Sequence, residues 1–178
     1  MTLDELIKKL DTKYEIVVGF PKEKQIVYPP DDRKGHHNKG GQTVAQVANW
    51  NEFGTKNKKG NKHIPSRPFL RTALKKNRSE IMRLVQNAFL PKNINNSNNL
   101  DKIGMIMVQM VKSSIRNGNW VPNAEQTKIS KLKYKTKKLL LKTDEKSKKI
   151  VQEEMNKNKP LIDRGIMLKS VNYEVRKI

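Results

Sequence analysis

The sequence predicts an α+β fold in which a small antiparallel sheet packs with two long amphipathic helices and several shorter ones. A β-branched and aromatic segment at 14–20 and an alternating apolar–polar segment at 171–178 are typical of strands. Between them, residues 68–89 and 100–117 repeat apolar side chains at helical spacing. The length of 178 residues is appropriate for one domain, so we expect residues 1–178 to form a single domain.

Positive charge dominates the composition. Lys and Arg number 38 against 17 Asp and Glu, which gives a formal charge of +21. Apolar residues make up only 35%, and the mean hydropathy is −0.81, so we expect a small core and extensive solvated or partner-covered surface. Such a surface favours a nucleic-acid or acidic protein partner. A genome rich in A and T, which favours Lys and Asn codons, is an alternative origin of the charge.

The chain contains no cysteine, which excludes disulfides and thiolate metal sites and is typical of a protein matured in a reducing cytoplasm. No apolar run reaches the roughly 18 residues that span a bilayer, so we expect no membrane partner. The first ten residues, MTLDELIKKL, are amphipathic and unlike a signal peptide. Thr2 and Glu5 have the spacing of a capping box and predict a short helix over 2–11.

An N-terminal hairpin is the simplest interpretation of the next segment. The first strand is expected at Tyr14–Phe20, and residues 21–24 turn the chain into a second strand at Gln25–Tyr28, closed by two prolines. The strand at 171–178 would then pair with this hairpin in one small sheet.

Residues 31–42 form a polar, glycine-containing loop with some potential metal ligands. The candidates for a metal or nuclease site are Asp31, Asp32, His36, His37 and the later His63. However, adjacent histidines in a loop cannot both face one ion without strain, and no predicted helix or strand presents them. We therefore expect no metal, no cofactor and no enzymatic activity.

A short helix is predicted after this loop. Thr43 is the N-cap, an apolar stripe follows, and Gly54 stands where a left-handed C-terminal cap would lie. Residues 56–63 then hold four lysines and one histidine, so they form either a solvated tether or a finger that binds anions. The lysines that would contact DNA or an acidic partner are Lys56, Lys58, Lys59 and Lys62.

The longest apolar stripe follows an extended segment. Pro65 and Pro68 keep the preceding residues extended, and Pro68 suits the first position of a helix. The stripe over 68–89 is more typical of a core face than of a cofactor site; its members are Phe69, Leu70, Ala73, Leu74, Ile81, Leu84, Val85, Ala88 and Phe89. We also hypothesise that Glu52 pairs with Arg67 or Arg71 and clamps the base of the lysine-rich loop.

Pro91 and a polar linker separate this helix from the next, at 100–117, and a short link favours an antiparallel helix pair. Gly104 inside the second helix indicates close helix packing. Residues 128–159 contain 12 lysines and four acids, so we expect an arm that buries little surface, with a helix at 145–156 compatible with its pattern. A short helix or turn at 165–170 leads into the last strand.

Four short motifs occur in order along the chain. They are EFGT at 52–55, IPSRPFLR at 64–71, PNAEQT at 122–127 and PLIDRG at 160–165. Together with the helices between them, these motifs resemble the tailed-phage virion-morphogenesis, or tail-completion, family of small neck proteins. The resemblance covers about residues 43–178. It implies structural roles for Glu52, Phe53, Gly54, Thr55, Pro65, Arg67, Pro68, Phe69, Arg71, Pro160, Leu161, Asp163 and Gly165.

The resemblance implies that Gly54 and Pro68 set the backbone geometry, that Phe69 anchors the helix, and that Asp163 caps the following turn. The chain departs from the family at Arg164, where Thr is usual, and at 128–159, which resembles a lysine-rich insertion. The family further implies a homo-oligomeric ring, a hexamer or dodecamer without enzymatic activity. The ring would lie at the head–tail junction of a virion assembled in the bacterial cytoplasm, beside neck, connector and tail proteins and near the genomic DNA.

A second function stays open on the sequence alone. The charge is also compatible with a free cytoplasmic protein that binds nucleic acid through non-specific phosphate contacts. No aromatic-rich or Gly-x-x-Gly nucleic-acid module is recognisable, and the aromatic residues are scattered.

Overall fold

The computed structural model describes residues 14–21, 26–30, 40–56, 58–60, 62–90, 98–162 and 164–178. These residues form an α+β structure with two small antiparallel sheets, which confirms the predicted fold class. The helix expected at 2–11, the loop with His36 and His37, and Pro91 lie outside the described residues.

The chain divides into two compact units. Unit 1 comprises the described residues of 1–25, 68–114 and 170–178, and unit 2 those of 26–67 and 115–169. That the two units act as one domain stays a prediction. Within the described ranges, no helix is long and apolar enough to cross a membrane.

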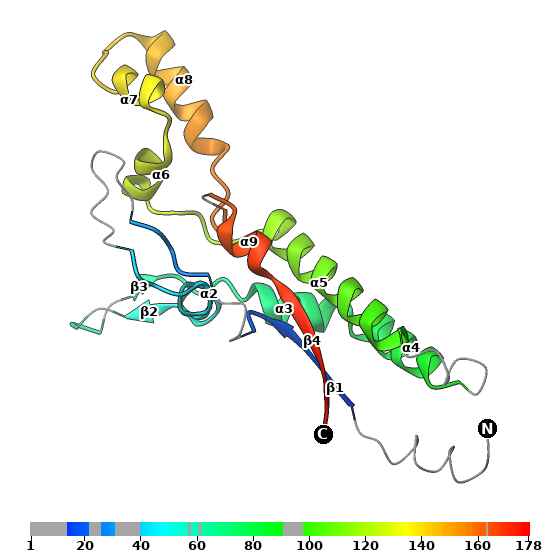
Figure 1. Ribbon diagram of the computed structural model, residues 1–178. Coiled ribbons are helices and arrows are strands. Elements are labelled where there is room, and N and C mark those ends of the chain that lie inside the picture. Colours follow the sequence, from blue (N-terminus) through cyan, green and yellow to red (C-terminus); the bar gives the residue numbers. More distant parts are fainter. Residues whose placement is uncertain are drawn as a thin grey trace, which may run out of the picture. The chain divides into compact units, whose positions relative to one another are not determined.

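The sheet of unit 1 joins two strands that are far apart in the sequence. Strand β1 (Tyr14–Gly19) pairs antiparallel with strand β4 (Asn172–Lys177), with Tyr14 opposite Lys177 (Figure 1). Both segments are rich in the β-branched and aromatic side chains that favour a pleated surface. The expected pairing of the first and last strands is therefore confirmed.

The prediction of a hairpin between 14–20 and 25–28 is wrong for the described residues, because β1 pairs with β4 and not with residues 26–28. Val27 instead forms an antiparallel bridge with Thr43. The N–H of Tyr28 donates to the carbonyl of Gln42 at 2.8 Å, and the N–H of Val44 donates to that of Ile26 at 2.9 Å. The backbone of 26–28 is thus satisfied by the chain that enters the next helix.

The long helix predicted at 68–89 is interrupted. Helix α3 (Phe69–Lys76) ends at Asn77, whose φ of −104° and ψ of 14° are not helical, and helix α4 (Arg78–Ala88) begins directly after it. The side-chain Nδ2 of Asn77 donates to the carbonyl of Ala73 at 2.7 Å, and such local bonding competes with helix continuation. Pro68 precedes α3 as its N-cap rather than occupying its first turn.

Helix α5 (Asn99–Asn117) runs antiparallel to α3 and α4, as predicted. Near its end, Ser114 Oγ donates to the carbonyl of Phe69 at 2.9 Å. Nearer its middle, Met107 lines an apolar groove together with Leu74 of α3 and Met82 of α4. The residue number therefore rises along α3 and α4 while it falls along α5, so the helices are antiparallel.

The core of unit 1 centres on Phe69, which is fully buried. Its ring meets that of Phe20 edge to face, with the ring centres 6.4 Å apart. Gly104 of α5 lies against the ring of Tyr173 in β4, so the close approach predicted at this glycine is present and its partner is a strand residue. The predicted apolar stripe is buried only in its first half, because no residue of α4, all of which the structure describes, is buried.

Unit 2 begins with helix α2 (Val44–Phe53), which has the predicted boundaries. Thr43 and Gln46 form a capping box: the N–H of Gln46 donates to Thr43 Oγ1 at 3.2 Å, and the N–H of Thr43 donates to Gln46 Oε1 at 2.9 Å. Two backbone donors at the helix start are thereby satisfied. A short antiparallel sheet follows, formed by β2 (Thr55–Lys56) and β3 (Lys62–Ile64).

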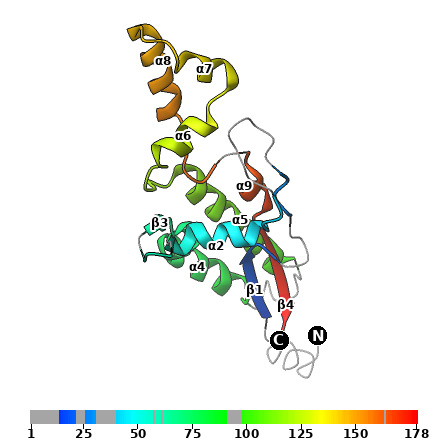
Figure 2. The same cartoon turned by 90° about the vertical axis from the view of Figure 1, so that its left-hand side faces the viewer.

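Most side chains of the lysine-rich stretch 128–159 are exposed or half-buried, as expected, although the stretch is largely helical and has a small core. It contains most of α6 (Glu125–Lys131), α7 (Tyr134–Leu139) and α8 (Glu145–Asn156), and α7 lies beside α8 (Figure 2). A small core of its own is made by Leu132, Val151 and Met155, with Ile129 and Leu139 packed against it. These residues are too far apart in sequence to form one visible stripe, yet the helix turns bring them together. Helix α9 (Ile166–Ser170) then leads to β4, as predicted.

Candidate functional site

Arg67 joins three separate chain segments of unit 2. The side chain is only 4% exposed. Its Nε donates to the carbonyl of Val121 at 2.8 Å, Nη1 donates to Asn51 Oδ1 at 3.1 Å, and Nη2 donates to the carbonyl of Pro122 at 3.3 Å and to Asn123 Oδ1 at 3.1 Å. Its backbone N–H adds a bond to the carbonyl of Asn51 at 2.6 Å. The planar fork of donors therefore fixes the C-terminal part of α2, the segment before α3 and the loop at 121–123.

These hydrogen bonds define what the cluster does chemically. The hydrogen-bond acceptors around the Arg67 guanidinium are backbone carbonyls and side-chain amides, which are neutral. Burial lowers the pKa of Arg67, because removing the charged form from water is unfavourable. The arrangement positions backbone and does not form a general acid–base pair.

Gly54, the third residue of the EFGT motif, directly follows the last residue of α2. Its φ of 76° lies in the region that favours glycine, although its ψ of 173° is not that of the left-handed cap we expected. A Cβ at this position would lie 2.8 Å from the carbonyl oxygen of Ile64 and 2.9 Å from the nitrogen of Ser66. Ser66 Oγ also donates to the carbonyl of Glu52 at 2.8 Å. Only glycine allows the two segments to approach this closely.

The neighbouring motif residues differ in exposure. Glu52 is 3% exposed, whereas Phe53 is 61% exposed. Thr55 Oγ1 accepts a hydrogen bond from the N–H of Ile64 at 3.2 Å, and Pro65 is half-buried in the extended segment beyond it. The hypothesis that Glu52 pairs with Arg67 or Arg71 stays a prediction.

The lysine-rich loop is a β-hairpin, which we call the lysine hairpin (residues 55–64). Thr55 pairs with Ile64 and Lys56 with Lys62, so the two ends of this segment are paired backbone. The side chains of Lys56, Lys58 and Lys59 are exposed. The sequence analysis missed these two strands because they are only two and three residues long and rich in lysine, which is depleted in strands.

Three further motif residues belong to unit 1. Pro68 caps α3, Phe69 is fully buried in the core, and Arg71 is exposed on the first turn.

The PLIDRG motif forms a turn that a lysine holds in place. Nζ of Lys131 donates to the carbonyls of Ile162 at 3.1 Å and Lys159 at 3.4 Å. Leu161 is buried and Gly165 has a φ of 73°, which favours glycine. Lys131 could not be identified from the sequence, because nothing distinguishes it from the other lysines around it. Asp163, expected to cap this turn, lies outside the described residues.

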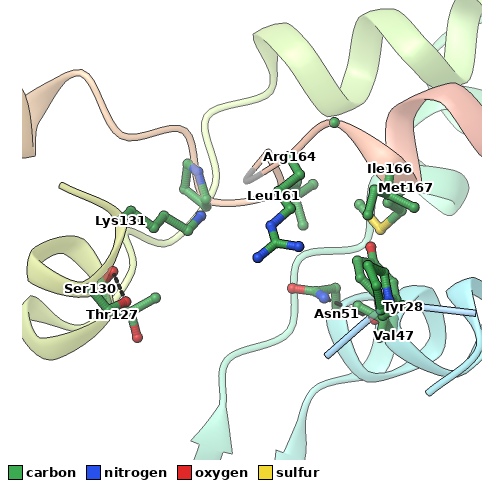
Figure 3. A pocket seen from close by; sticks show the side chains of 13 residues that line it. Tyr28, Val47, Asn51, Thr127, Ser130, Lys131, Leu161, Arg164, Ile166 and Met167 are labelled. Carbon is green, nitrogen blue, oxygen red and sulfur yellow. Dashed lines mark hydrogen bonds between the residues drawn. The ribbon is translucent and has the colours of Figure 1, made fainter. Parts of the chain in front are cut away.

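A cavity of about 250 Å³ lies within unit 2 between α2, α6 and this turn (Figure 3). Arg164 extends into it from the turn, between the side chains of α6 and Asn51 of α2. An apolar part of the lining is made by Val47, Leu161 and Met167, and a polar part by Asn51, Lys131 and Arg164. The sequence alone does not predict that Arg164 lines a cavity.

Metal binding finds no support where the structure has been described. In those ranges, no group of three or more His, Cys, Asp or Glu side chains is arranged to hold a metal ion. Arg67, Asn51 and Asn123 form a hydrogen-bonded side-chain cluster in unit 2.

No family model matches the chain, and no curated protein or solved structure is significantly similar to it.

Proposed function

We propose that the protein is a structural subunit of the neck of a tailed phage, which joins or completes the tail as a ring around or near the DNA conduit. One observation carries this proposal: two of the motifs that resemble the tail-completion family, and the residue directly before a third, share the hydrogen bonds of Arg67. Asn51 directly precedes EFGT, Arg67 belongs to IPSRPFLR, and Pro122 and Asn123 open PNAEQT.

Exposed apolar side chains on the helices of unit 1 support self-association. Met82 of α4 is 50% exposed and Met105 of α5 is 56% exposed, and Phe89 directly after α4 is 46% exposed. Apolar surface of this kind is typical of contact sites between proteins. Identical subunits that use two different surfaces form rings when the rotation between them closes.

The exposed lysines of the lysine hairpin favour a binding partner that is negatively charged. Lys56, Lys58 and Lys59 are exposed on a short paired scaffold, and the whole chain carries a formal charge of +21. In a ring around DNA, such lysines would meet phosphates without reading the base sequence. Acidic surfaces of connector or tail proteins are the other partners that this charge favours.

A second candidate is a free nucleic-acid-binding protein, and the same three exposed lysines are the observation that favours it. Size-exclusion chromatography with light scattering, with and without duplex DNA, separates the two functions. The neck proposal predicts a discrete oligomer whose mass is a multiple of 20.6 kDa without DNA. A stable monomer that shifts duplex DNA would favour the second candidate.

Paired variants make this experiment specific to the apolar surface. Met82→Glu places a charge on the exposed face of α4 and is expected to dissociate the oligomer. Leu141→Glu makes the same kind of change at a residue of unit 2 that is 89% exposed, and it should leave the mass unchanged. Equal effects of the two variants would contradict a contact through α4.

A further inference from the structure

We propose that the cavity between α2, α6 and the 160–165 turn binds an acidic segment of a partner polypeptide, with Arg164 as the carboxylate-binding residue. The inference stands on the lining of this cavity and does not depend on the phage proposal. Arg164 is exposed and extends into the cavity, where a ligand from solvent can reach it (Figure 3).

The charge of the lining selects an anion. Lys131 and Arg164 both line the cavity, and the described lining residues include no Asp or Glu. Since the Nζ of Lys131 donates to the carbonyls of Lys159 and Ile162, that ammonium is held in place beside the cavity. A carboxylate entering the cavity would therefore meet two positive charges, one of which lies on a planar fork that suits bidentate binding.

Two neutral polar side chains of the lining, those of Asn51 and Ser130, form hydrogen bonds within the protein. Asn51 Nδ2 donates to the carbonyl of Val47 at 2.9 Å, and Asn51 Oδ1 accepts from Arg67. Ser130 Oγ donates to the carbonyl of Thr127 at 2.8 Å. These bonds shape the wall of the cavity.

The size and the apolar part of the cavity favour a peptide over a nucleic acid. About 250 Å³ lies below the roughly 300–1,000 Å³ of typical small-molecule sites, so it suits one or two amino-acid side chains. Val47, Leu161 and Met167 supply apolar surface that a phosphodiester backbone would not use. An Asp or Glu next to an apolar residue matches both parts of the lining.

Methyl NMR of the full chain tests this assignment. The probe is a blocked Asp-Leu-Glu tripeptide, added to protein with labelled methionine methyl groups, and Met167 is the reporter because it lines the cavity. We expect the acidic tripeptide to shift the Met167 signal in a saturable manner. A blocked Asn-Leu-Gln tripeptide, which has the same shape without charge, should not shift it.

Substitutions then assign the effect to Arg164. Arg164→Gln should weaken binding about tenfold or more, because a charge-assisted pair is lost, and Arg164→Lys should weaken it less. Lys149→Gln removes the same charge from an exposed residue outside the lining and should leave the affinity unchanged. Thermal unfolding of each variant shows whether the fold is retained.

Three outcomes would overturn the proposal. These are the absence of a Met167 shift with the acidic tripeptide, equal weakening by Lys149→Gln and Arg164→Gln, and an equal Met167 shift with inorganic phosphate at the same concentration. The last outcome would indicate a site for small anions in general rather than for an acidic peptide.

Discussion

Asn123 Oδ1 accepts a hydrogen bond from Nη2 of Arg67 at 3.1 Å, although the two residues are 56 positions apart in the sequence. The bond fixes the orientation of the Asn123 amide and places its Nδ2, which is buried, where it has no hydrogen-bond partner among the described residues.

Replacing Arg67 is therefore expected to destabilise unit 2. Arg67→Met keeps much of the side-chain volume but leaves the carbonyls of Val121 and Pro122 and the amides of Asn51 and Asn123 without their donor. We expect the free energy of unfolding to fall by about 2–4 kcal/mol, as measured by urea denaturation. Arg116→Met, a change at an exposed residue, is the control. Similar losses for both variants would contradict the role given to Arg67.

Gly104→Ala tests the packing of α5 on the sheet of unit 1. The added Cβ would overlap the ring of Tyr173, so helix or ring must move. We expect a loss of about 1–3 kcal/mol in the free energy of unfolding, as is typical of overpacked positions. Gln109→Ala, on an exposed part of the same helix, is the matched control.

A double variant shows whether the contact with Tyr173, rather than some other effect of alanine at position 104, causes the loss of stability. If the ring of Tyr173 is the obstacle, Gly104→Ala combined with Tyr173→Ala should lose less than the sum of the two single losses. Strictly additive losses would show that the two residues do not interact.

The pH dependence of stability tests the surroundings of Tyr173. Burial, followed by the hydrogen bond that Tyr173 Oη donates to Asp101 Oδ1 at 3.2 Å, raises the pKa of Tyr173. The folded state thus holds the phenol proton more tightly than the unfolded chain, so this stabilisation is complete below about pH 10 and is lost as pH rises through the folded-state pKa.

Tyr173→Phe should therefore make the alkaline loss of stability less steep than in the wild type, measured by chemical denaturation between neutral and alkaline pH. Asp101→Asn should reduce the steepness only in part, because burial is the larger cause. A wild-type profile that Tyr173→Phe leaves unchanged would refute the assignment.

Strong local signals explain which elements could be predicted from the sequence. Helix α2 has a capping box at its start and a glycine at its end, and both are visible in the sequence. Helix α5 and strand β4 have clear helical and alternating patterns over 19 and six residues. For these segments the local preference and the tertiary structure agree.

The elements that were missed depend on contacts between distant residues. The break at Asn77 interrupts a stripe whose spacing continues across it, so periodicity alone cannot detect it. Leu132 and Val151 meet only after α7 and α8 have folded back on each other. In the candidate site, Arg67 was noted as part of a motif, but its partners at 121–123 depend on the fold.

The lysine hairpin provides a test of DNA contact. Replacing Lys56, Lys58 and Lys59 together by Gln should weaken duplex binding and reduce the slope of log affinity against log salt by about two to three, since each phosphate contact contributes about 0.9. The control replaces three exposed lysines of the 128–159 stretch, Lys135, Lys142 and Lys149, and removes the same charge. Equal changes in slope would show that total charge, rather than the hairpin, binds the DNA.

Electron microscopy of the purified full chain tests the central proposal most directly. A neck subunit is expected to form closed rings, so class averages should show rotational symmetry with a central opening and six or twelve copies of the 20.6 kDa chain. Particles that remain single subunits at every protein concentration and salt concentration tested would contradict the ring.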